Sequence, residues 1–288
     1  MIKISKVIIS ALGCLLFAVP VFSDVIRLPG DANADELPVQ LLKEVVRREP
    51  SLSLAFPYDG AKERIAKSRL MADIENNQLD VFWSSTNIEF EDKYLPVRIP
   101  IYRGLLGYRI AIVSAQNENI FAGVKSLSDL KKFKAGQGLH WADTKILRHN
   151  GIEVVTSNKS VNLFAMLDGG RFDYFPRGIH QPWREIKANS QYDLVVEPHV
   201  LIRYPVPNYL FVNKNNKALW RLLTDELNKM YEDGTYVALF KNNQAMKDAV
   251  AKANIGRRLV LEIDNPTLPP NTPLHVKHYW FDPLVDTF

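Results

Sequence analysis

Polar and aromatic side chains gather in this sequence where predicted strands end. Four such ends lie at residues 29–31, 83–86, 138–143 and 176–178. In open α/β sheets, ligands bind beyond the carboxyl ends of strands, close to helix N-termini. Together these loops offer hydroxyls, aromatic rings, a carboxylate and a guanidinium, which are the groups that a small-molecule site requires. The candidate ligand-binding residues in and near them are Tyr58, Trp83, Ser84, Ser85, Thr86, Trp141, Asp143 and Arg177.

Two of these candidates carry charge. Arg177 stands between a proline and a glycine at a predicted strand end, a place that core packing does not readily explain. Its guanidinium is suited to hold a carboxylate through two parallel hydrogen bonds. Asp143 is expected to orient a polar group of the ligand. The alternative for Asp143 is a helix-start residue that the helix dipole stabilises.

The uncharged candidates have structural alternatives as well. Trp141 and Tyr58 are expected to supply flat walls for the ligand, but Trp141 could instead pack in the protein core. The hydroxyls of residues 84–86 are expected to orient polar groups, but they could simply cap a turn.

The sequence lacks the common enzyme motifs, and one histidine pair has a metal-like spacing. The sequence has no dinucleotide-binding or phosphate-binding glycine motif, no nucleophile elbow and no zinc-protease motif. His275 and His278 have a spacing that suits a metal, but they lie in a proline-flanked tail without a carboxylate or cysteine partner. We therefore expect no catalytic residue, metal or cofactor. A Ser/His/Asp set assembled in space stays open, because sequence does not reveal it.

The first 23 residues have the parts of a secretory signal. Lys3 and Lys6 precede an apolar run, and the first acidic residue follows Ser23, after which cleavage is expected. A membrane anchor is the alternative, but Pro20 breaks the run and a spanning helix needs roughly 20 apolar residues. Cys14 is the only cysteine, and the sequence around it only weakly resembles a lipoprotein processing site. The sequence thus predicts a periplasmic protein without disulfides.

Charge and composition narrow the function classes further. The net charge of the whole chain is +4, and the predicted signal removes two lysines and no acid. A chain so close to charge balance does not favour nucleic-acid binding, which requires a concentrated basic face. Hydrophobic residues make up 47% of the chain, enough for the core of one large domain or two medium lobes.

Strand-like and helix-like segments alternate along the chain, which is typical of an α/β protein. A helix is expected to start near residues 35–38 and a short one near residues 129–132. Longer predicted helices cover residues 61–77, 141–150, 161–167, 217–231 and 234–241. Predicted strands cover residues 25–28, 52–56, 79–83, 110–113, 134–137, 153–156, 172–175, 194–196 and 208–212, and the tail from residue 254 is strand-like, then rich in proline.

Four segments, taken in order, resemble the type II periplasmic solute-binding proteins, in particular family 3, which includes amino-acid receptors of ABC transporters. NNQLDVFWSST at 76–86 is similar to the family's strand and Ser/Thr ligand loop, and IPIY at 99–102 to its Ser-x-Pro-Tyr segment. SLSDLK at 126–131 with KAGQ at 134–137 is similar to the entry into its second lobe. LDGGRFD at 167–173 is similar to its Gly-Arg-hydrophobic-Asp element.

The resemblance implies two α/β lobes, each a mixed sheet flanked by helices, that close on a small ligand about a hinge. Residues 24–113 and 200–288 would form lobe one, residues 114–199 lobe two, and Tyr102 would join the ligand-binding residues. The function implied is capture of a small polar or anionic organic solute and its delivery to the membrane permease of an ABC transporter. We expect a monomer.

Two departures from the family pattern concern the ligand. Family members that bind α-amino acids carry an arginine three residues after the loop threonine, where this chain has Glu89. They also carry an aspartate in the region that holds Arg177 here. We therefore do not expect the family's usual grip on an α-amino acid.

Three other functions stay open at this point. The same fold could present its ligand to a membrane sensor in signalling. It could be a secreted hydrolase with a site assembled between the lobes. It could also be a scaffold that has kept the fold and lost its ligand.

Overall fold

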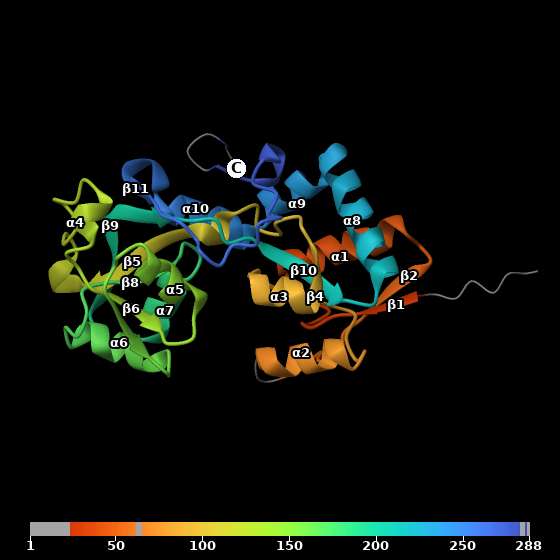
Figure 1. Cartoon of the computed structure of the whole chain (residues 1–288), viewed down its shortest axis with the longest axis horizontal. Coiled ribbons are helices and arrows are strands. Elements are labelled where there is room, and N and C mark those ends of the chain that lie inside the picture. Colours follow the sequence, from red (N-terminus) through yellow and green to blue (C-terminus); the bar gives the residue numbers. More distant parts are fainter. Residues whose placement is uncertain (1–23, 62–64, 283–285, 287–288) are drawn as a thin grey trace, which may run out of the picture.

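The computed structural model describes residues 24–61, 65–282 and 286 of the chain. The predicted signal segment and Cys14 lie outside these residues, so the cleavage site stays a prediction. Strands and helices alternate along the described chain, as predicted for an α/β protein. In Figure 1 they gather into two lobes at opposite ends of the molecule.

The first lobe begins with a parallel β-α-β unit. β1 (Asp24–Arg27) pairs in parallel with β2 (Leu52–Ala55), and α1 (Leu37–Arg48) connects them. The face of α1 that carries Leu41 and Val45 is fully buried, because its apolar side chains recur at helical spacing.

An antiparallel sheet completes the strands of this lobe. β10 (Asn208–Asn213) lies between β3 (Val81–Ser85) and β4 (Tyr94–Val97) and pairs with both. α2 (Lys67–Glu75) precedes β3, and α3 (Ile88–Lys93) joins β3 to β4. β10 comes from far along the chain, so both halves of the sequence build this lobe.

Three helices near the C-terminus pack on the first lobe. They are α8 (Lys217–Glu232), α9 (Thr235–Asn242) and α10 (Gln244–Ala253). Leu227 of α8 and Phe240 of α9 are fully buried in the same hydrophobic cluster as the apolar face of α1.

The second lobe is built on three strands that run in the same direction. β6 (Ala135–Gly138) pairs in parallel with β7 (Val154–Ser157), and Ala135 also pairs in parallel with Tyr174, next to β8 (Phe175–Gly178). The helices of this lobe are α4 (Leu127–Leu130), α5 (Ala142–His149), α6 (Val161–Asp168) and α7 (Pro182–Ala188).

Long strands connect the two lobes. β5 (Tyr108–Ser114) pairs with β8 on one side and with β9 (Leu194–Arg203) on the other, and β11 (Leu259–Glu262) adds to β9 in parallel. In β5, Ile110 packs in the first-lobe cluster and Val113 in a second cluster. Short 3₁₀ turns lie at Leu105–Gly107, Ala115–Asn117, Ile255–Arg257 and Lys277–Tyr279.

The segment after β11, residues 264–281, is here called the C-terminal strap. At its start, Asp264 and Asn150 exchange two hydrogen bonds of 3.1 and 2.8 Å, which tie it to the second lobe. At its end, the backbone N–H of Phe281 donates to the carbonyl of Arg103 at 2.8 Å, and Phe281 is buried in the first-lobe cluster. The strap is thus anchored on both lobes, and it runs between them in Figure 1.

The predicted elements are largely confirmed, with differences at their ends. The helix predicted from residue 61 starts at Lys67 as α2. Arg177 was expected in a loop after a strand, but it lies within β8, because β5 pairs with residues 175–178. α7, α10, α3 and β4 were not predicted. Among the described residues, no helix is long and apolar enough to cross a membrane.

Candidate ligand-binding site

The parallel strands of the second lobe end at one edge, here called the second-lobe edge. It consists of residues 139–143, the loop after β6 and the start of α5, and residues 179–185, the loop after β8 and the first turn of α7. A Cβ on Gly138 would lie 2.5 Å from the Trp141 ring, so glycine at this position lets the ring fold over the end of β6. The sequence folds this way locally because Thr144 also donates a 2.7 Å hydrogen bond back to the carbonyl of Gly138.

Arg177 is fixed at this edge by a carboxylate and by two rings. Its Nε and Nη2 donate to the two carboxylate oxygens of Glu185 at 2.7 and 2.6 Å. Its Cζ lies 4.8 Å from the ring centroids of both Trp141 and Phe175. A bidentate pair with aromatic neighbours is a well-oriented arrangement for a guanidinium.

Asp143 takes part in a second charged group at the same edge. Its carboxylate lies 3.0 Å from Nη2 of Arg109 and accepts a hydrogen bond from the hydroxyl of Tyr204. Nε of Arg109 donates to the same hydroxyl at 2.9 Å. Arg109 is on β5 and Tyr204 directly follows β9, so Asp143 connects the second lobe to both long strands.

Burial shifts the ionisation of this second group. It acts to lower the pKa of Arg109, but the charge of Asp143 and the Tyr204 hydroxyl outweigh it and raise that pKa. Burial also raises the pKa of Tyr204 well above its ordinary value, against the effect of Arg109. Arg109 and Tyr204 therefore both keep their protons at neutral pH.

His180 follows β8 at the same edge. Its side chain is exposed at the surface, although neighbouring protein removes part of its hydration. This desolvation, together with the positive charges of Arg109 and Arg177, lowers its pKa to about 4. The imidazole is neutral at pH 7 and adds no charge to the edge.

The first-lobe candidates lie at the end of β3. Trp83, Ser84 and Ser85 are partly exposed on the strand. Thr86 is buried, and its hydroxyl donates to Glu91 at 2.8 Å. Its hydroxyl is therefore used in a contact within the first lobe, with a side chain and not with the backbone of a turn.

The remaining tyrosines also make contacts inside the first lobe. The Tyr58 hydroxyl bonds the carboxylate of Asp73 on α2. Tyr102 packs against the first-lobe cluster, and desolvation raises its pKa. Glu89, where the family resemblance led us to look for arginine, is exposed and pairs with Lys93 at 3.3 Å.

The structure therefore brings Trp141, Asp143 and Arg177 together at one edge and places the other six candidates in the first lobe. A ligand role for all nine stays a prediction. Sequence reasoning missed Arg109, Tyr204 and Glu185. Of these three, only Arg109 stands out in the sequence, because it is a charged residue in the otherwise apolar run of β5.

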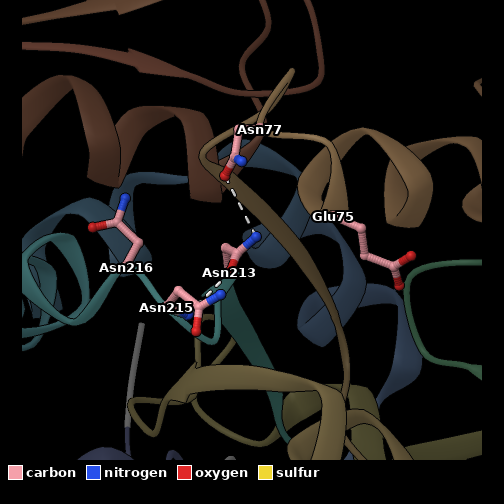
Figure 2. A pocket seen from close by; sticks show the side chains of 5 residues that line it. All are labelled: Glu75, Asn77, Asn213, Asn215 and Asn216. Atoms are coloured by element: carbon pink, nitrogen blue, oxygen red, sulfur yellow. Dashed lines mark hydrogen bonds between the residues drawn. The ribbon is translucent and has the colours of Figure 1, made fainter.

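A cavity of about 320 Å³ lies elsewhere, at the end of α2, and Figure 2 shows its lining. Its side chains are mostly amides: Glu75, Asn77, Asn213, Asn215 and Asn216. Asn213 donates to the carbonyl of Ile74 at 3.0 Å and accepts from the backbone of Asn215. Asn216 accepts from the backbone of Leu219 and so caps α8. These amides hold the segment that connects β10 to α8. The cavity therefore lies at the opposite end of β3 from Ser85.

No group of three or more His, Cys, Asp or Glu side chains in the described part of the chain could hold a metal ion. The His278 ring lies edge-on against Tyr231, with centroids 5.5 Å apart, and also against Tyr279. It is packed among aromatic rings.

Solved structures share this fold. A probable amino-acid ABC transporter extracellular-binding protein, YtmK of Bacillus subtilis, matches with a TM-score of 0.55 and 18% identity, over 78% of this chain and 99% of that chain. An ancestral arginine-binding protein bound to arginine matches with a TM-score of 0.52 and 18% identity, over 77% and 99%.

A histidine kinase sensor domain with similarity to periplasmic binding proteins matches with a TM-score of 0.51 and 15% identity, over 76% of this chain and 95% of that chain. No family model and no curated protein matches the chain. At these identities the likeness concerns the fold. The chain has the two-lobed α/β fold of the type II periplasmic binding proteins, as its sequence predicts.

Proposed function

We propose that this chain is an extracytoplasmic solute-binding protein that captures a small polar organic solute between its lobes and delivers it to a membrane transporter. The observation that carries the proposal is the second-lobe edge, where Trp141, Arg177 and Asp143 come together at the ends of β6 and β8. Ligand sites of open α/β folds lie at such edges. The name of one structural neighbour, an ABC transporter extracellular-binding protein, points the same way.

In this proposal the solute enters with the lobes apart. The exposed face of the Trp141 ring stacks on a flat part of the solute, while Trp83 and Ser84 approach from the first lobe. Contacts made to both lobes favour the closed state, because a ligand shifts a conformational equilibrium toward the state that it binds better. The transporter then recognises the closed protein.

No covalent step belongs to this function. The neighbouring proteins named above are binding proteins and a sensor domain. We propose that this chain likewise returns its solute unchanged.

A thermal-shift screen of the purified protein against amino acids, small carboxylates, polyamines and sugars tests the proposal. A solute that binds only the folded state stabilises it by about 2.7 kcal/mol at a concentration one hundred times Kd. We expect at least one solute to raise the melting temperature in a concentration-dependent way.

The variant Trp141→Ala should abolish the shift, and Arg171→Ala, which changes an exposed side chain of the same lobe, should leave it intact. A screen in which no solute stabilises the protein, or recovery of a chemically altered solute, contradicts the proposal.

A signalling role is the second candidate, favoured by the match to a histidine kinase sensor domain. Deletion of the gene distinguishes the two roles once a solute is known. Loss of solute uptake indicates a transporter partner, and loss of a transcriptional response with intact uptake indicates a sensor partner.

A further inference from the structure

We infer that Glu185 determines the class of solute: it occupies Arg177, so that the second-lobe edge rejects carboxylates and accepts neutral polar groups. This inference rests on the proposed function and specifies the chemistry of the same site.

The geometry of the pair is the first step. Glu185 meets Arg177 with both oxygens, at 2.7 and 2.6 Å, which is how a solute carboxylate would bind a guanidinium. Only 12% of the Arg177 side chain and 18% of the Glu185 side chain are exposed. The protein's own carboxylate already takes the position that a solute carboxylate would need.

The rings beside the pair keep Arg177 in place. Trp141 and Phe175 are nearly parallel, with an angle of 16° between their planes and 6.2 Å between their centroids. Both lie 4.8 Å from Cζ of Arg177. Because the guanidinium is held against two rings, it cannot turn to a new partner without losing these contacts as well.

A second arginine at the edge, Arg109, is occupied in the same way. Arg109 meets Asp143 at 3.0 Å, and their side chains are 11% and 20% exposed. Tyr204 bonds both, so this pair is also closed to a new carboxylate. With two arginines and two carboxylates in contact, the charges of these four side chains cancel.

To form two parallel bonds with Arg177, or to pair with Arg109, an entering carboxylate would have to displace Glu185 or Asp143 and leave that group unpaired in a mostly buried place. A charge left unpaired at such a site is strongly unfavourable, and the displaced carboxylate would also repel the solute. A neutral amide or hydroxyl group avoids this cost. It can accept from Nη1 of Arg177, which takes no part in the two bonds to Glu185, while stacking on Trp141.

The test compares solutes that differ only in a carboxylate and an amide. Glutamine and glutamate, asparagine and aspartate, and succinamide and succinate are titrated by calorimetry into the unaltered protein and into Glu185→Gln. Any solute found in the broad screen is paired with its own amide or carboxylate analogue. Glu153→Gln is the matched control, because Glu153 lies in the same lobe, is exposed and pairs with Lys134.

We expect the unaltered protein and Glu153→Gln to bind the amide member at least tenfold more tightly than the carboxylate member. Glu185→Gln frees Arg177 and should shift this ratio at least tenfold toward the carboxylate. If Glu185→Gln does not fold, Glu185→Ala is measured on the same solute pairs in its place, with the same expected shift.

An unchanged ratio in the Glu185 variants, or a preference of the unaltered protein for the carboxylate member, overturns the inference and leaves the proposed function intact. Absence of any binding, in the broad screen as well as in the pairs, overturns the proposed function and the inference together.

Discussion

Tyr204 is the residue that joins the two long strands to the second lobe through a single hydroxyl. That hydroxyl accepts from Arg109 and donates to Asp143, and Tyr204 itself is only 2% exposed. Tyr204→Phe removes both bonds and leaves two buried charged groups with one partner fewer. Hydrogen bonds to charged groups contribute about 1.5–3 kcal/mol. We expect a loss of stability in that range, measured by urea unfolding.

Tyr174 provides the matched control. It is fully buried, and its hydroxyl has no hydrogen-bond partner among the residues that the structure describes. Tyr174→Phe should therefore be neutral or slightly stabilising, because a buried polar group without a partner is itself unfavourable. Equal losses in the two variants would contradict the role given to the Tyr204 hydroxyl.

Trp141, Asp143 and Arg177 could be predicted to lie near one another, because their loops follow strands that run in the same direction. Their partners could not. Glu185 is eight residues from Arg177 and faces it only because α7 begins where it does. Tyr204 reaches Asp143 across 61 positions of sequence. Such pairing depends on tertiary packing, which local pattern does not encode.

Elements with a strong hydrophobic periodicity could be predicted from the sequence. Elements that form only because a neighbouring strand or helix packs against them could not. α8 matches its predicted range to within one residue, because its apolar face is long and regular. β8 contains Pro176, which argues against a strand in the sequence. It is a strand because β5 supplies its hydrogen-bond partner along one side. α7 and β4 are short, and short segments carry a weak periodic signal.

The turn before β5 is an element whose shape depends on the C-terminal strap. Gly104 has φ of +86°, and a Cβ there would lie 2.6 Å from Cε3 of Trp280 on the strap. Gly104→Ala therefore introduces backbone strain at residue 104 and a steric clash with the Trp280 ring. Left-handed backbone costs a residue with a side chain about 1–2 kcal/mol, and overpacking adds about 1–3 kcal/mol.

Gly234 separates these two effects. Its φ is +83°, but a Cβ there would have nothing within 4 Å. Gly234→Ala should show the strain alone, so in chemical denaturation Gly104→Ala should lose at least about 1 kcal/mol more. Similar losses for both variants would mean that the strap yields to the added methyl group and does not shape the turn.

At the scale of the whole molecule, the two lobes have separate hydrophobic clusters that share connecting segments. Phe281 at the end of the strap belongs to the first-lobe cluster, whereas Leu261 and Ile263 before it pack with Val113 in the second. The order of motifs predicted two lobes. It assigned all residues after 200 to lobe one, and the exact residue boundaries stay a prediction. A strap anchored at both ends, crossing beside β5 and β9, should limit how far the lobes separate.

Lengthening the strap tests this restraint without removing either anchor. Six Gly/Ser residues inserted between Pro270 and Asn271, both exposed, give the strap slack and disrupt only one local turn. The same insertion between Ala122 and Gly123 disrupts one local turn outside the strap and is the control. Spin labels at Lys145→Cys and Arg221→Cys, in purified protein expressed without residues 1–23, report the distance between lobes. Because a hinge opens as far as its tethers allow, the strap insertion should broaden that distance distribution and the control insertion should not. A distribution that the strap insertion leaves as narrow as in the unmodified chain would show that β5 and β9 alone set the hinge.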